Sequence, residues 1–170
     1  MNLADVQAVI QSAKARGTDS LEQFIRARLP DASDHEVTEA AEVAVEIIET
    51  VPIFLARAAQ EAEERAMVPI VQPLLDHAVR YFTSPVDLIP EMTLGLAGLL
   101  DDAYLVLRIL SNLERGAEPF LDWDLEHPTA FLRGLVCEGV GRRLDVISFQ
   151  AMDEVSAQIS ALWNGPSAEA

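Results

Sequence analysis

Four carboxylates in one stretch are the residues of this chain whose type and spacing are suited to chemistry. Asp87 and Glu91 lie four positions apart, and the adjacent pair Asp101 and Asp102 follows. Hard oxygen ligands of this kind bind Mg²⁺ or Ca²⁺. Two carboxylates with separated pKa values are also the minimum for general acid and base catalysis. The catalytic candidates are therefore Asp87, Asp101 and Asp102, and the metal-ligand candidates are the same three with Glu91.

The same carboxylates also suit a structural role, which is the preferred interpretation. Acidic side chains in the first turn of a helix compensate the helix dipole and cap its free N–H groups, at roughly 0.3–1 kcal/mol each when exposed. Adjacent residues of a helix point in different directions, so at most one of Asp101 and Asp102 faces Asp87. Capping is thus the expectation, with a divalent cation or a catalytic site as the alternative.

Other catalytic and metal-binding patterns are missing. Di-iron bundles carry Glu-x-x-His on two helices, and the nearest spacing here is Asp124 before His127, beside Pro128. The HExxH, P-loop and dinucleotide-binding patterns do not occur. His77 is a lone histidine on a predicted helix and is interpreted as a surface or hydrogen-bonded residue. No cofactor is expected apart from the divalent cation already considered.

The segment Asp122 to Glu126 alternates oxygen side chains as a calcium loop does. His127 and Arg133 stand where such a loop requires glycine and a bidentate glutamate, so the calcium interpretation is discounted. We expect Trp123 and Phe120 to anchor this loop on the core.

A helix-start signal precedes the acidic pair. Ser84 suits the N-cap, Pro85 the first helical position and Asp87 the third, where each satisfies or avoids an unpaired N–H group. Pro90 cannot continue that helix, so the helix must be short. The structural motif is thus Ser84, Pro85, Asp87 and Pro90.

These residues carry a resemblance. The string S-P-V-D-L-I-P followed by G-L-L-D-D-A resembles the signature of the YkvA-like family, a small helical domain of unknown function in bacterial proteins. The resemblance covers about Leu75 to Leu113. It implies a helical domain in which Asp87, Asp101 and Asp102 are family-typical positions, and it implies no reaction. Some relatives are membrane-associated, whereas this chain lacks a spanning segment.

The apolar stretch Leu99 to Leu113 predicts a buried central helix, because its apolar residues cover more than one stripe. It is a poor membrane span, since Asp101 and Asp102 at the centre of the surrounding segment cost about 2.5–3.5 kcal/mol each. The sequence therefore predicts a compact all-α bundle of seven or eight helices around this helix.

The whole chain, residues 1–170, is expected to be a single helical domain. A hairpin appendage spans 1–30, a long acidic helix 31–66, the YkvA-like core 68–115 and C-terminal helices 116–164. Gly17 is predicted to end the first helix, and Asp19 and Ser33 to begin capping boxes. Pro69 and Pro73 are expected to mark a break or a first turn, and a helix is expected from Leu74. Two further helices are expected, one from Pro128 to about Val140 that Gly139 and Gly141 end, and one from about Leu144 to Trp163.

The net charge of −16 limits the partners. Acidic residues are spread along the chain without a basic patch, which disfavours nucleic acid and anionic membrane surfaces. A basic protein partner or a homo-oligomer is compatible with this charge. Cys137 is the only cysteine and is interpreted as a buried, inert thiol in an apolar helix. The lone cysteine and the lack of a signal peptide predict a cytoplasmic location.

Three functions remain open, and the sequence leans away from an enzyme. The first is a non-enzymatic interaction or regulatory module that uses an apolar or acidic surface. The second is a divalent-cation-dependent enzyme that uses Asp87, Asp101 and Asp102. The third is an acidic immunity-type protein that neutralises a basic toxin through complementary charge.

Overall fold

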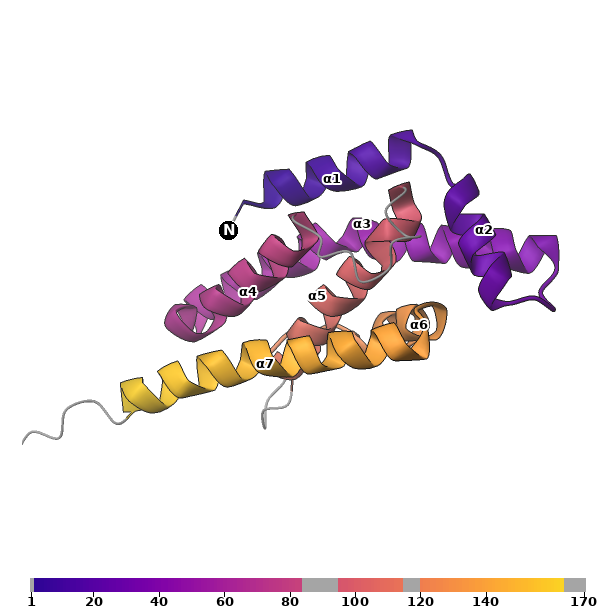
Figure 1. Ribbon diagram of the computed structural model, residues 1–170. Coiled ribbons are helices and arrows are strands. Elements are labelled where there is room, and N and C mark those ends of the chain that lie inside the picture. The colour runs from indigo at the N-terminus through magenta and orange to yellow at the C-terminus, as the bar shows by residue number, and fades with distance from the viewer. Residues whose placement is uncertain (1, 84–94, 115–119, 164–170) are drawn as a thin grey trace, which may run out of the picture.

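The computed structural model describes residues 2–83, 95–114 and 120–163, and these residues contain helices and no strand. The all-α prediction is confirmed (Figure 1). Seven α-helices and one 3₁₀ helix follow in chain order: α1 (Leu3–Ala15), α2 (Asp19–Arg28), α3 (Asp34–Glu64), α4 (Val68–Thr83), η2 (Gly95–Leu99), α5 (Leu100–Leu113), α6 (Glu126–Leu135) and α7 (Glu138–Trp163).

Helix α5 lies at the centre, as the apolar stretch predicts. Eleven of its fourteen residues are buried. It contacts α3, α4, η2, α6 and α7, and Figure 1 shows it crossing between α1 and α7. None of the helices in the described part of the chain combines the length and hydropathy that a membrane crossing requires.

The N-terminal helices begin and end largely where the sequence indicates. Gly17 follows α1 with a φ of +84°, a conformation that side chains with a Cβ rarely adopt. At the start of α3, the Ser33 side chain accepts from the Glu36 N–H at 3.3 Å, and the Glu36 carboxylate accepts from the Ser33 N–H at 2.8 Å. The capping box predicted at Asp19 is wrong, because Thr18 is the N-cap and its side chain makes no capping hydrogen bond.

Two predicted boundaries need correction. Helix α4 starts at Val68 and not near Leu74, so Pro69 lies in its first turn and Pro73 inside it. Proline is tolerated in a first turn, whose N–H groups have no helical partner. Helix α4 stays helical through the internal Pro73, and seven of its side chains are buried.

The boundary between α6 and α7 also differs from the prediction. Helix α6 ends at Leu135, and Val136 is extended with a ψ of 138°. Helix α7 then begins at Glu138 and contains Gly139 and Gly141, which were expected to end the preceding helix. Cys137 therefore lies at the junction of the two helices, and it is half-buried and free, contrary to the expected buried position within a helix.

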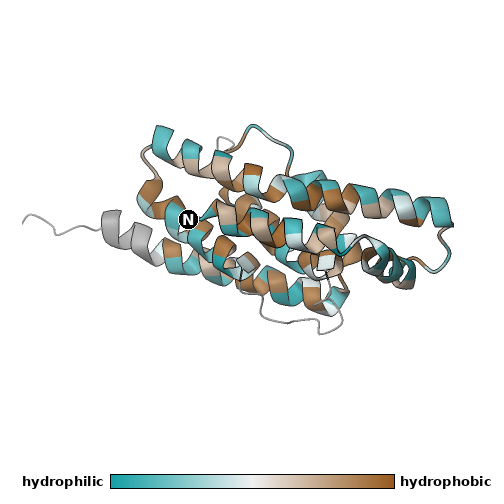
Figure 2. Cartoon of the chain, turned by 90° about the horizontal axis from the view of Figure 1, so that it is seen from above, coloured by the Kyte–Doolittle hydropathy of each residue, from teal (hydrophilic) through white to brown (hydrophobic). Residues whose placement is uncertain are grey.

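The hydropathy pattern agrees with a bundle whose helices each bury one face (Figure 2). Figure 2 shows hydrophilic and hydrophobic residues sharing the same helices. Several large apolar side chains stay exposed, and they lie on α3, on α7 and between α5 and α6: Ile53 at 58%, Val146 at 54%, Phe149 at 42% and Trp123 at 39%.

Candidate functional site

The acidic pair of the sequence motif is buried at the start of α5. Asp101 is 5% exposed and Asp102 is 1% exposed, although both lie in the first helical turn. Carboxylates that only compensate the helix dipole can stay exposed to solvent. The burial of Asp101 and Asp102 is therefore not explained by that role alone. The other predicted members, Ser84, Pro85, Asp87, Pro90 and Glu91, lie outside the described residues.

Tyr81, in the last turns of α4, is electrostatically coupled to this pair. Burial, followed by the negative charges of Asp101 and Asp102, raises the pKa of the Tyr81 phenol to about 12. The side chain is 8% exposed, and its hydroxyl has no hydrogen-bond partner within the described structure. One turn earlier on α4, the Nε2 atom of His77 is also buried without a partner there. Sequence analysis assigned no role to Tyr81.

The described residues hold no group of three or more His, Cys, Asp or Glu side chains arranged for a metal ion. Asp101 and Asp102 are the only predicted ligands that the structure places. Whether Asp87 and Glu91 join them therefore stays a prediction.

A second polar cluster links α5 to α7, and sequence reasoning missed it. Asp145 Oδ1 accepts from the Tyr104 hydroxyl at 2.6 Å and from Arg108 Nε at 3.0 Å. Burial, and then the hydrogen bond to Asp145, raises the pKa of Tyr104 to about 12. Tyr104 and Arg108 lie four residues apart on one helix face, a spacing that could have indicated their shared partner.

An acidic hollow lies where α5, the following loop and α6 meet. Its volume is about 320 Å³, and it is lined by Ser111, Glu114, Trp123, Asp124, Leu125 and Glu126. Trp123 packs edge-on against Phe54 of α3, with ring centroids 5.1 Å apart. The predicted loop anchoring holds for Phe120, which is 3% exposed, but Trp123 keeps 39% of its surface exposed.

Hydrogen bonds fix the shape of this acidic hollow. The Glu114 carboxylate accepts from the Phe120 N–H at 3.2 Å and the Leu121 N–H at 2.6 Å. Asp124, which precedes the N-cap residue Leu125, accepts from the first N–H groups of α6, those of Glu126 at 3.0 Å and His127 at 3.3 Å. The bond from the His127 N–H is the main cause that lowers the pKa of Asp124. Glu126 is exposed, and its carboxylate enters no hydrogen bond or ion pair in the described structure.

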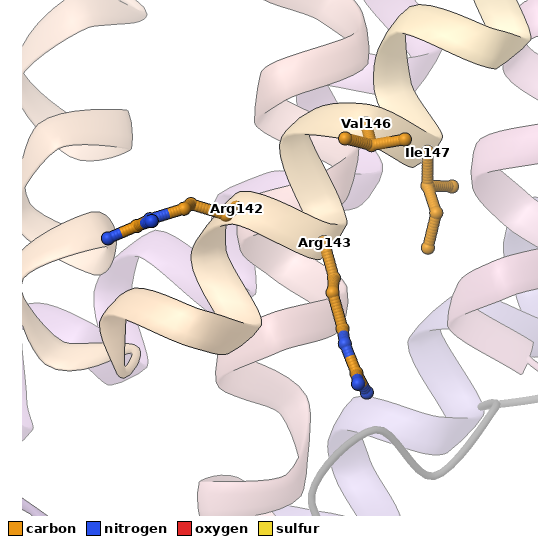
Figure 3. A pocket seen from close by; sticks show the side chains of 4 residues that line it. All are labelled: Arg142, Arg143, Val146 and Ile147. Atoms are coloured by element: carbon orange, nitrogen blue, oxygen red, sulfur yellow. The ribbon is translucent and has the colours of Figure 1, made fainter.

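A second, shallow hollow of about 360 Å³ lies on α7 (Figure 3). Arg142, Arg143, Val146 and Ile147 line it. Figure 3 shows Arg143 and Ile147 on one side of the helix and Arg142 pointing away from them. Arg142 bonds to the Glu138 carboxylate at 2.9 Å. All four lining residues belong to one helix, so this hollow has little depth.

Comparison with known proteins adds a family resemblance without a function. Residues 77–107 match a family described as a protein of unknown function (DUF1232). The match covers less than half of the chain, and it includes Tyr81, Asp101 and Asp102. The name YkvA-like and the motif around Ser84 stay predictions. Neither a curated protein nor a solved structure matches the chain.

Proposed function

We propose that this chain is a non-enzymatic interaction module that binds a basic segment of a partner protein. The observation that carries the proposal is the acidic hollow, where the exposed indole of Trp123 lies among the carboxylates of Glu114, Asp124 and Glu126.

This lining suits the side chain of arginine or lysine. A cation over an indole face gains about 0.5–1 kcal/mol at an exposed site and more when desolvated. The carboxylates add charge attraction, and the negative C-terminal end of α5 adjoins the hollow at Ser111 and Glu114. A volume of about 320 Å³ is at the lower limit for ligand pockets, so one side chain suits it better than a large cofactor.

Burial of the matched carboxylates supports a binding role over catalysis. With 5% and 1% of their surfaces exposed, Asp101 and Asp102 offer almost no area to a substrate. Enzymes position catalytic groups within hydrogen-bond reach of the substrate. The net charge of −16 also supports a basic partner, because a strong field of one sign accelerates encounters with the opposite sign.

An immunity-type role is a second candidate, and the outer face of α3 favours it. Glu39, Glu42 and Glu46 are exposed on that face and enter no ion pair within the described residues. Exposed Val43 and Ile53 share the helix. A broad acidic and apolar face of this kind suits a folded basic protein better than a single side chain.

Fluorescence titration tests the module. In a Trp163→Phe background, Trp123 is the only tryptophan. We expect a lysine- and arginine-rich peptide to change its emission, and Glu126→Gln to weaken binding at least threefold. The matched control is Asp153→Asn, which removes the same charge from an exposed position on α7.

If Glu126→Gln and Asp153→Asn weakened peptide binding equally, the acidic hollow would not be the binding site. Weakening by Glu42→Gln but not by Glu126→Gln would favour the face of α3. Binding of an acidic peptide as tightly as the basic one would contradict both candidates.

A further inference from the structure

One face of α7 is exposed along the part of the helix whose side chains the structure describes. The opposite face packs on α5 and α4, and Figure 1 shows α7 along one side of the bundle. The exposed residues recur at intervals of three and four, which places them on one face of a helix. They are called the α7 stripe below: Arg142, Arg143, Val146, Phe149, Gln150, Asp153 and Glu154.

The α7 stripe is basic at one end, apolar in the middle and acidic at the other end. Residues 142 and 143 are arginines, and the acidic residues 153 and 154 follow about three turns later. Between the two ends lie the exposed apolar side chains of Val146 and Phe149. The stripe therefore has a direction that a binding partner has to match.

The charges of the stripe are available to such a partner. Arg142 bonds to the Glu138 carboxylate one turn earlier, but both side chains are exposed, and exposed pairs of this kind contribute little to stability. Arg143, Asp153 and Glu154 enter no ion pair among the described residues.

A partner that covers the whole stripe must present acidic, apolar and basic groups in the matching order. A uniformly acidic partner would be repelled at Asp153 and Glu154, and a uniformly basic one at Arg142 and Arg143. A second copy of α7 meets the requirement when the two helices run antiparallel, because a two-fold axis brings each end of the stripe onto the other end.

We propose that the α7 stripe is a self-association surface, on which α7 of a second copy packs antiparallel about a two-fold axis. The axis lies level with Ser148, which is buried on the opposite side of the helix. Residues at equal sequence distance from position 148 then face each other. At six positions Arg142 faces Glu154 of the second copy, and at five positions Arg143 faces Asp153 of the second copy.

The same register brings the apolar residues of the two copies together. Val146 faces Gln150 of the second copy, and Ile147 faces Phe149 of the second copy. Val146 and Ile147 line the shallow hollow of about 360 Å³ (Figure 3), so the phenyl ring of the second copy lies against it. On its own chain, the ring packs with the guanidinium of Arg108, 5.9 Å from the ring centroid.

The dimer is expected to be weak. From residue 142 to residue 154 the stripe is about 18 Å long, which is short for an interface of standard size. Two copies with a net charge of −16 each also repel one another. At physiological salt the Debye length is about 8 Å, so charges far from the interface are screened more than the facing pairs.

Two charge-swap variants test the register. Arg142→Glu/Arg143→Glu makes the charges of the stripe all acidic, and Asp153→Arg/Glu154→Arg makes them all basic. Each variant alone should associate at least tenfold more weakly than the wild type, because like charges then face each other at both ends. An equimolar mixture should form a heterodimer at least as stable as the wild-type dimer, since every facing pair is complementary again.

Sedimentation equilibrium at physiological ionic strength measures the four samples. The mixture has the same total charge as two wild-type chains, so a change in overall repulsion does not explain the rescue. The matched control Glu39→Arg/Glu42→Arg makes the same change of charge on the exposed face of α3, and it should associate at least as tightly as the wild type. All substituted positions are exposed, so the variants should fold, and thermal melts check this.

The proposal is overturned if the wild type stays monomeric at high micromolar concentration, or if the mixture does not associate. Self-association of Asp153→Arg/Glu154→Arg alone would also overturn it, because the stripe would then dock on an acidic face such as that of α3. None of the stripe residues lines the acidic hollow, so failure of this proposal leaves the interaction module standing. Asp153→Asn likewise leaves the hollow intact with or without the dimer.

Discussion

Asn112 is a polar side chain buried near the end of α5. It is 4% exposed, and neither its amide nitrogen nor its amide oxygen has a hydrogen-bond partner in the described structure. Leucine has the same number of non-hydrogen side-chain atoms as asparagine, with the same branching. Asn112→Leu should therefore raise the free energy of unfolding by roughly 1–3 kcal/mol, because the desolvation cost of the amide disappears.

Urea denaturation measures this change, with an unchanged m-value as the sign that unfolding remains comparable. Asn112→Asp is the opposite control and should destabilise the protein, since it buries a charge. If Asn112→Leu lowered the free energy of unfolding instead, the Asn112 amide would make a stabilising hydrogen bond in the folded protein.

The two tyrosines are the only ones in the chain, and the pKa of each is raised to about 12, chiefly by burial. The unfolded-state pKa is about 10. A raised folded-state pKa contributes stability that is present below pH 10 and is lost as the pH rises from 10 to 12. Absorbance at 295 nm should thus show no tyrosinate at pH 10 in the folded protein. Ionisation of either tyrosine near pH 10, without unfolding, would contradict the burial of Tyr81 or Tyr104.

Single residues were the hardest part of the candidate site to predict. The sequence singled out Asp101 and Asp102, but their burial depends on α4 and on neighbours that are distant in sequence. Tyr81 and Asp145 have no motif, because their roles arise only when helices pack. Trp123 was expected to be an anchor, and its exposed indole follows from edge-on packing against Phe54.

At the scale of helices, Gly141 shows why the boundary between α6 and α7 was mispredicted. Glycine is a poor helix former, so two glycines suggested an end. In the structure, a Cβ on Gly141 would collide with the guanidinium of Arg133. That guanidinium contacts Glu138 at 3.2 Å and Asp145 at 3.9 Å. Gly141 is therefore explained by interhelical packing, which local propensity does not capture.

A double-mutant cycle tests this explanation. Gly141→Ala gains up to about 1 kcal/mol of helix propensity but displaces Arg133. In the wild type we expect no net gain or a loss, whereas in an Arg133→Ala background the same change should stabilise by about 0.5–1 kcal/mol. Thermal or urea unfolding of the four proteins gives the coupling. Equal effects in both backgrounds would show that the guanidinium does not restrict this position.

The helices that were predicted well have local causes. Ser33 and Glu36 cap α3 through their own side chains, and the apolar pattern of α5 is wide enough to indicate burial. Pro69 and Pro73 were compatible with either a break or a first turn, so the sequence did not decide where α4 starts; the first-turn interpretation holds for Pro69. Helix α4 contains both prolines, because Pro69 lies in its first turn and apolar side chains are buried around Pro73.

At the scale of the whole molecule, the charge of −16 governs encounters more than it governs the fold. Binding of a basic peptide should weaken as salt is added, because the Debye length falls from about 10 Å at 0.1 M to about 3 Å at 1 M. We expect the dissociation constant to rise at least tenfold between 0.05 and 0.5 M NaCl, mainly through slower association. Stopped-flow kinetics measures both rates, and a salt-insensitive association would contradict electrostatic steering.

The most direct test of the central claim is nuclear magnetic resonance mapping of the amide signals during titration with a lysine- and arginine-rich peptide. The proposed interaction module predicts that the largest shifts fall on Ser111, Glu114 and Trp123 to Glu126, and that Glu126→Gln reduces them. Shifts confined to α3 or α7, or no shifts at peptide concentrations that saturate a micromolar site, would contradict it.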